Sequence, residues 1–131
     1  MKKNLLFITL LASITGCTSL TPQNNYIEIA RETPPANYIG TWTGTIGHYL
    51  STFKINSDGS GIMCNSWHKH NSVERIKFNA GSIYPQSGSS INLSPKDNKL
   101  IGKIDSFGSG TYIFVRDDKL DEAAPYCLDK I

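Results

Sequence analysis

From residue 38 to residue 116 the sequence alternates short runs of β-favouring residues with turn signals, and this alternation constrains the fold most. The turns recur about every 8–12 residues, as they do between the strands of an all-β domain. Asn56-Ser57-Asp58-Gly59 is a clear hairpin turn, and Gly108-Ser109-Gly110 marks another. No stretch with a helical period is long enough to form a helix of consequence. The predicted strands cover residues 38–46, 49–55, 61–67, 73–79, 82–85, 90–93, 99–104 and 111–116.

This spacing predicts an all-β fold, a small antiparallel up-and-down β-barrel or sandwich of about eight short strands. Closure into a barrel is attractive because it removes exposed strand edges. The bulky aromatic side chains of the predicted strands are Tyr49, Phe53, Phe78, Tyr112 and Phe114. Since the strands are short and these side chains are large, we expect them to fill the interior.

The first residues of the chain have the pattern of an export signal. Lys2 and Lys3 precede an apolar run from Leu5 to Ala12, which is too short to span a bilayer as a helix. Ile14-Thr15-Gly16-Cys17 follows and resembles the lipobox of bacterial lipoproteins. The resemblance implies cleavage before Cys17, attachment of diacylglycerol to its thiol, and acylation of the new amine. Several acyl chains on one residue would make a stable membrane anchor.

The same resemblance implies a destination and a domain plan. Thr18 stands where an Asp would retain a lipoprotein in the inner membrane, so the expected location is the outer membrane, on either face. We expect a signal peptide over 1–16, a lipidated cysteine with a flexible tether over 17–37, and a β-barrel domain over 38–131. Within the tether, the apolar residues near Tyr26 could form a turn or rest on the domain. The whole chain resembles small Gram-negative outer-membrane lipoproteins, a likeness that implies no activity.

The charge of the mature protein argues against a nucleic-acid partner. The chain has 13 Lys and Arg against 11 Asp and Glu, a net charge of +2. Lys2 and Lys3 leave with the predicted signal peptide, so 13 minus 2 leaves 11 basic side chains against 11 acidic ones. A neutral domain has no electrostatic reason to bind a polyanion.

The two remaining cysteines, Cys64 and Cys127, predict a disulfide. Export would place them in an oxidising compartment, and two is an even count. The bridge would close a loop of about 60 residues and contribute roughly 4 kcal/mol in the loop-entropy model.

The predicted first strand contains Gly40-Thr41-Trp42, which is similar to the Gly-x-Trp signature of lipocalins and related barrels. In that family the Trp closes one end of the barrel, and an Arg from the last strand packs across it. Arg116 ends the last predicted strand and could take that part beside Trp42, with Gly40 in the signature position. The likeness also implies a carrier role, in which the barrel holds a small apolar ligand.

Trp67-His68-Lys69-His70 raises a metal hypothesis. On a strand, His68, His70 and Cys64 would project to one side, where they could ligate zinc or copper. Because Cys64 is expected in the disulfide and the run ends at a turn, we predict two exposed histidines at a hairpin tip. No metal, other cofactor or catalytic residue is predicted, because no nucleophile elbow, zinc-protease motif or phosphate loop is present.

These observations favour a non-enzymatic, lipid-anchored envelope lipoprotein that binds a protein or glycan through its surface, or serves as a structural module. The alternative is the lipocalin-like carrier of an apolar ligand. A third hypothesis comes from a resemblance to lipoproteins that inhibit c-type lysozyme. It depends on Ser109-Gly110 and Gly110-Thr111-Tyr112-Ile113-Phe114, followed by Asp121-Glu122-Ala123 and Cys127.

Overall fold

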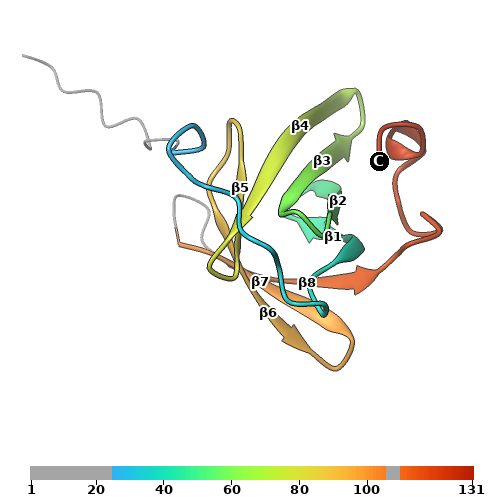
Figure 1. Cartoon of the computed structure of the whole chain (residues 1–131). Coiled ribbons are helices and arrows are strands. Elements are labelled where there is room, and N and C mark those ends of the chain that lie inside the picture. The colour runs from blue at the N-terminus through green and yellow to red at the C-terminus, as the bar shows by residue number, and fades with distance from the viewer. Residues whose placement is uncertain (1–24, 106–109) are drawn as a thin grey trace, which may run out of the picture.

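The computed structural model describes residues 25–105 and 110–131, and these form an antiparallel barrel of eight strands in sequence order (Figure 1). The predicted all-β barrel is therefore confirmed. The strands are β1 (Gly40–Ile46), β2 (Tyr49–Ile55), β3 (Ser60–Trp67), β4 (His70–Asn79), β5 (Ser82–Pro85), β6 (Ile91–Lys96), β7 (Lys99–Ile104) and β8 (Gly110–Arg116). A short 3-10 helix, η1 (Pro125–Cys127), follows in the C-terminal tail.

Neighbouring strands pair along most of their lengths, except at two places. β8 meets β1 through two residue pairs, Trp42 with Arg116 and Thr43 with Val115. β5 and β6 also share only two pairs, Ser82 with Asn92 and Ile83 with Ile91. The barrel is thus closed mainly toward the end where β1 begins and β8 finishes.

Two strands extend three residues beyond the ranges that the sequence predicted, because their turns are tighter. β4 begins at His70, since His68 and Lys69 alone make the turn from β3. β6 continues to Lys96, and the turn to β7 consists of Asp97 and Asn98 with φ values of 49° and 59°. Left-handed backbone at both positions is the conformation of a two-residue hairpin turn whose twist matches its strands.

The large apolar side chains gather in the half of the barrel toward the start of β1. Phe53, Phe78 and Phe114 are buried there with Trp42, and the rings of Phe53 and Phe114 meet edge to face at 4.9 Å. Isoleucine, leucine and methionine side chains from six of the strands complete this core. Burial of these large side chains supplies the main driving force for closing so small a barrel.

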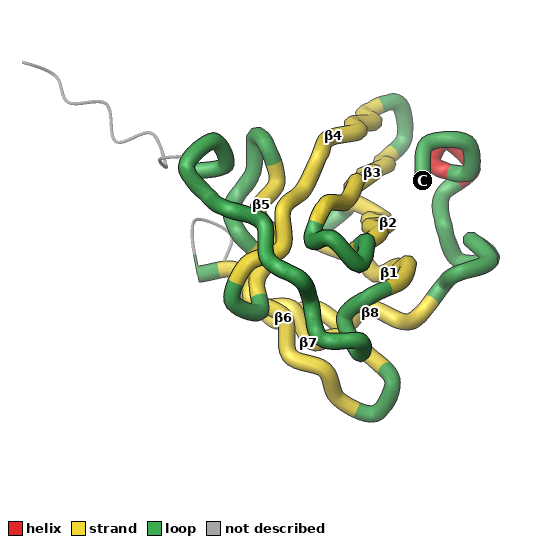
Figure 2. The backbone as a smooth tube through the Cα atoms, in the orientation of Figure 1, coloured by secondary structure: helices red, strands yellow, loops and turns green. Residues whose placement is uncertain are grey.

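Residues 25–39 lie against the outside of the barrel, although residues 17–37 were expected to form a flexible tether. Lys77 donates hydrogen bonds to the carbonyl oxygens of Tyr26 and Ile29, at 2.8 and 3.0 Å. The backbone N–H of Glu32 donates to the carbonyl oxygen of Phe78 at 3.0 Å. Figure 2 shows this segment as a loop that runs across the barrel wall from beside β5 to the start of β1. Within the range expected to be a tether, residues 26–32 are therefore hydrogen-bonded to the barrel.

The C-terminal tail lies on another part of the barrel wall, beside β3 (Figure 1). Cys64 of β3 and Cys127 of η1 form the predicted disulfide, across 63 positions of sequence. Both cysteines are fully buried, in a small cluster with Ala124. Asp117, at the start of the tail, accepts a 2.8 Å hydrogen bond from Thr43, whose hydroxyl also bonds that of Thr52. The tail is thus fixed by a covalent bond and by a buried polar network.

Candidate functional site

One end of the barrel is closed by Trp42 and Arg116. Trp42 is 1% exposed, and its indole N–H donates to the carbonyl oxygen of Tyr38 at 2.9 Å. The guanidinium of Arg116 lies over the indole, 4.7 Å from the ring centre, and donates to the carbonyl oxygen of Ile39 at 3.0 Å. Cation–π attraction and shape together seal this end. The structure therefore brings together Trp42 and Arg116, the pair that the lipocalin resemblance implies.

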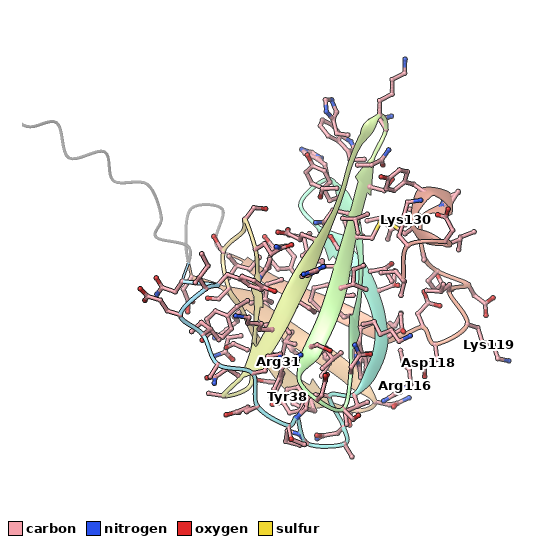
Figure 3. The ribbon with its side chains drawn as sticks, turned by 45° about the horizontal axis from the view of Figure 1, so that its top comes forward. Arg31, Tyr38, Arg116, Asp118, Lys119 and Lys130 are labelled. Atoms are coloured by element: carbon pink, nitrogen blue, oxygen red, sulfur yellow. A yellow bond between two sulfur atoms is a disulfide. The ribbon has the colours of Figure 1, made fainter. Side chains whose placement is uncertain are left out.

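Gly40 permits this close approach. Its φ is 130°, and a Cβ added there would lie 2.5 Å from the nearest guanidinium nitrogen of Arg116. The backbone conformation therefore favours glycine at this position, and an added Cβ would displace the Arg116 guanidinium. Figure 3 shows Arg116, Asp118 and Tyr38 at the end of the barrel opposite the β3–β4 turn.

Asp118 holds Arg116 in place at this closed end. Its carboxylate accepts hydrogen bonds from the Thr41 backbone N–H at 2.9 Å and from Arg116 at 3.0 Å. These bonds, the one from Thr41 first, lower the pKa of Asp118 below its ordinary value of 3.8. The carboxylate therefore stays ionised, and Arg116 stays paired, at any pH near neutrality.

Among the described residues, the other end of the barrel is open and holds a cavity of about 700 Å³. Its apolar walls come from Ile46, Met63, Ile91, Ile104 and Tyr112. The expectation of a filled interior is therefore correct for the closed half and wrong for the open half. Phe53, Phe78 and Phe114 fill the closed half, whereas the two tyrosines expected beside them, Tyr49 and Tyr112, line the cavity. We call this cavity the cup.

Polar side chains line one wall of the cup, and they form hydrogen bonds with one another or with neighbouring groups of the protein. Ser51 donates to the amide oxygen of Asn65 at 2.6 Å, and the amide nitrogen of Asn65 donates to Ser72 at 3.3 Å. Glu74 accepts bonds from the backbone N–H and the hydroxyl of Ser87, at 2.8 and 2.7 Å. Among the described residues, every buried side-chain nitrogen and oxygen has a hydrogen-bond partner. A wall that satisfies its own polar groups can face an apolar ligand at little cost.

At the mouth of the cup, aromatic rings from two hairpin turns surround Trp67. His48 stacks on its indole at 5.3 Å between ring centres, His70 stacks at 5.6 Å, and Tyr49 meets it edge to face at 5.9 Å. We call His48, Tyr49, Trp67 and His70 the aromatic rim. Sequence reasoning missed it, because nothing local links His48 to Trp67. The antiparallel pairing of β2 with β3 brings them together. The sequence signal that could have revealed the rim was the concentration of aromatic residues at 48–49 and at 67–70.

His68 and His70 lie at a hairpin tip, as predicted. His68 has a φ of 52° in the two-residue turn, and His70 begins β4, so the two do not project from one strand. Cys64 is held in the disulfide. Within residues 25–105 and 110–131, no group of three or more His, Cys, Asp and Glu side chains could hold a metal ion.

Several predicted features fall outside the described residues. These are the signal peptide, Cys17, and Ser109 of the stretch that resembles lysozyme inhibitors. In the part of the chain that the structure covers, no helix is both long enough and apolar enough to cross a bilayer.

Comparison with known proteins agrees with this architecture. The family model described as "Bacterial lipocalin LPS transport optimiser YedD" matches residues 23–131. The crystal structure of the lipoprotein YedD from Klebsiella pneumoniae has a TM-score of 0.55 and 16% identity, and the match covers 80% of this chain and 90% of that one. A lipoprotein from Streptococcus pneumoniae has a TM-score of 0.53 and 13% identity, covering 66% of this chain and 100% of that one. No curated protein matches the chain significantly. At these identities, the likeness to the solved structures concerns the fold alone.

Proposed function

The chain belongs to the family of bacterial lipocalins described as the LPS transport optimiser YedD, and from that premise we propose that it is a lipid-anchored envelope lipoprotein that holds an acyl-bearing ligand in its cup. The ligand's chain would lie against the apolar walls, and its polar end would stay at the mouth. By binding such a ligand the protein would support LPS transport, the process that the family description names.

The observation that carries this proposal is the cup itself. A cavity of about 700 Å³, closed beneath by packed aromatic residues and open to solvent above, lies within the size range of small-ligand sites. Its walls are mainly apolar, and each CH₂ that leaves water contributes about 0.8 kcal/mol. A carrier of this kind needs no catalytic group, so the proposal includes no enzymatic activity.

Cys17 supplies the anchor in this proposal. Acylation there would attach the protein permanently to a membrane, and by the lipobox resemblance that membrane is the outer one. The described chain begins at residue 25, and the eight residues from 17 to 24 can extend about 28 Å at most. The barrel would therefore work close to the membrane surface, where acyl-bearing ligands are found.

Binding of a neutral amphiphile tests the cup directly. We expect the purified mature protein to bind dodecyl maltoside saturably at one site in calorimetry, below the micelle-forming concentration. Ser72 lines the cup and is exposed, so Ser72→Phe would fill space there without entering the core. Displacing about two CH₂ groups from the cup would weaken binding about tenfold.

Val73→Phe is the matched control. Val73 is the next residue on the same strand, is exposed, and faces away from the cup, so the same ring added there should leave affinity unchanged. In cells that lack the chain, the wild-type and Val73→Phe proteins should both restore exclusion of novobiocin by the LPS layer, and Ser72→Phe should not. Equal binding by both variants would refute the cup as the ligand site.

A second candidate is the surface-binding module, in which an envelope protein or a glycan docks on the outside of the barrel. A shallow groove of about 470 Å³ favours it, lined by parts of β1 and β8 and by Glu122 of the tail. Ile113 lies in this groove with 55% of its surface exposed. If this candidate is correct, Ile113→Asp should fail to restore exclusion of novobiocin in cells and should still bind dodecyl maltoside.

A lysozyme-inhibition assay on the purified protein tests the third hypothesis, the resemblance to lysozyme inhibitors, and absence of inhibition counts against it.

A further inference from the structure

All three histidines of the chain lie around the exposed Trp67, and two of them, His48 and His70, belong to the aromatic rim. His48 and His70 stack on Trp67, and the ring of His68 lies 5.4 Å away. Because β3 lies between β2 and β4, His48 and His70 approach Trp67 from opposite sides. Such an arrangement orients two imidazole rings at the entrance of the cup.

The rim is not part of the packing that holds the barrel together. Trp67 and Tyr49 each keep 37% of their surface exposed, and neither belongs to the main hydrophobic core. Burying a tryptophan stabilises a protein more than exposing one, and large exposed aromatic side chains are typical of binding surfaces. His48, Tyr49 and His70 all line the mouth of the cup.

The mouth of the cup carries hydrogen-bond donors suited to an anion. Lys69, in the β3–β4 turn, lines the cup beside His70. Among the described lining residues the single carboxylate is Glu74, and it already accepts two hydrogen bonds from Ser87. An ammonium offers three N–H donors, and a neutral imidazole still offers one. Donors of this kind bind phosphate oxygens, to which lysine contributes as a point charge.

From this arrangement we propose that Lys69 and the aromatic rim form a headgroup site, which selects a phosphate-bearing amphiphile over a neutral one with the same chain. The inference rests on the proposed function, because the cup must hold the chain whose headgroup the rim contacts. The ammonium of Lys69 and the imidazole N–H groups would bind the phosphate, and Trp67 would keep the imidazoles in place.

Two probes with one chain length separate the rim from the cup. We expect calorimetry to give dodecyl phosphate about tenfold tighter binding than dodecyl maltoside, the effect of one or two charge-assisted hydrogen bonds. Added salt should weaken the binding of dodecyl phosphate and leave that of dodecyl maltoside unchanged, because salt screens an exposed ion pair. Of the two tryptophans Trp42 is buried, so dodecyl phosphate should also protect the emission of Trp67 from acrylamide quenching.

Lys69→Gln should reduce the affinity for dodecyl phosphate to that for dodecyl maltoside and leave the latter unchanged. Lys103→Gln is the matched control: Lys103 is exposed and lies near the same end of the barrel, but it does not line the cup. Lys103→Gln should still bind dodecyl phosphate more tightly than dodecyl maltoside. This result would distinguish direct contact with Lys69 from the overall electrostatic field of the protein.

The possible failures differ in what they overturn. If neither amphiphile binds, the proposed function fails and this inference fails with it. If both bind equally, the cup stands and the headgroup site is refuted. If inorganic phosphate alone binds as tightly as dodecyl phosphate, the rim is a site for free phosphate, and selection among amphiphiles is likewise refuted.

Discussion

At the scale of single residues, the two ends of the barrel use tryptophan in opposite ways. Trp42 is buried and hydrogen-bonded beneath Arg116, where it closes the barrel. Trp67 is exposed between the imidazole rings of His48 and His70, which line the mouth of the cup. A single residue type thus supports stability at one end and the proposed recognition at the other.

The residue-scale prediction concerns Asp118. Its pKa is lowered in the folded state, so its stabilising effect is complete above its ordinary value of 3.8 and is lost as pH falls through the folded value. Its side chain is 52% exposed, so solvent screening reduces the contribution of its pairing with Arg116 to about 0.5–1 kcal/mol. We expect Asp118→Asn to lower the free energy of unfolding by that amount at pH 7, and the difference from wild type to become smaller as pH falls below 3.8, so that it is reduced at pH 3.

Urea unfolding at both pH values provides the measurement, and Asp121→Asn is the control. Asp121 is an exposed carboxylate of the same tail, and its replacement should change stability little at either pH. A difference for Asp118→Asn that is as large at pH 3 as at pH 7 would contradict the assigned pairing.

At the scale of elements, two segments outside the barrel are fixed to its wall. The N-terminal segment is held by hydrogen bonds from β4, and the tail by the disulfide and by Asp117. Tyr38 links the N-terminal segment to the core, since its ring meets Phe78 at 5.0 Å and its hydroxyl donates to the carbonyl oxygen of Leu93. A barrel with so small a core benefits from both attachments.

The element-scale prediction is that the disulfide supplies a large share of total stability. A bridge across 63 positions constrains the unfolded chain, and the loop-entropy model gives it about 4 kcal/mol. We expect Cys64→Ser combined with Cys127→Ser to lower the free energy of urea unfolding by about that amount. Wild-type protein unfolded with a reductant should match the double variant, and a midpoint equal to that of oxidised wild type would rule out this role.

Much of the secondary structure could be predicted from the sequence. The eight strands, their turns and the cysteine pair follow from local alternation, turn chemistry and an even cysteine count. The place of residues 25–37 was not readable, because polar and proline-rich sequence also suits an unpacked linker. Its attachment depends on Lys77 and Phe78, which are distant in sequence and adjacent only in the folded barrel.

At the scale of the whole molecule, the described part of the barrel is closed at one end and open at the other. Two carboxylates of the acidic tail, those of Asp117 and Asp118, serve internal hydrogen bonds. These two acidic side chains therefore stabilise the fold. The proposed ligand recognition depends on other residues, those at the mouth of the cup.

The whole-molecule prediction concerns the anchor. Radiolabelled palmitate should enter the wild-type protein and not Cys17→Ala, because the lipobox resemblance makes Cys17 the acylated residue. The wild-type protein should fractionate with the outer membrane. Cys64→Ser with Cys127→Ser should still incorporate the label, which separates acylation from the other cysteines. Recovery in inner-membrane fractions alone would refute the predicted sorting.

The sequence by itself predicted an up-and-down order of strands and the disulfide, because each depends on local pattern or on residue chemistry. The closure by Gly40, Trp42 and Arg116 was implied by the lipocalin resemblance. Only the tertiary structure decided where the interior is filled. The inward positions of the open half include small and polar residues such as Ser51, Asn65 and Ser72, and those of the closed half are large. Which inward positions share a layer depends on the register between strands, and no single strand contains that information. The register also brought His48 to Trp67, and so created the rim beside the cup.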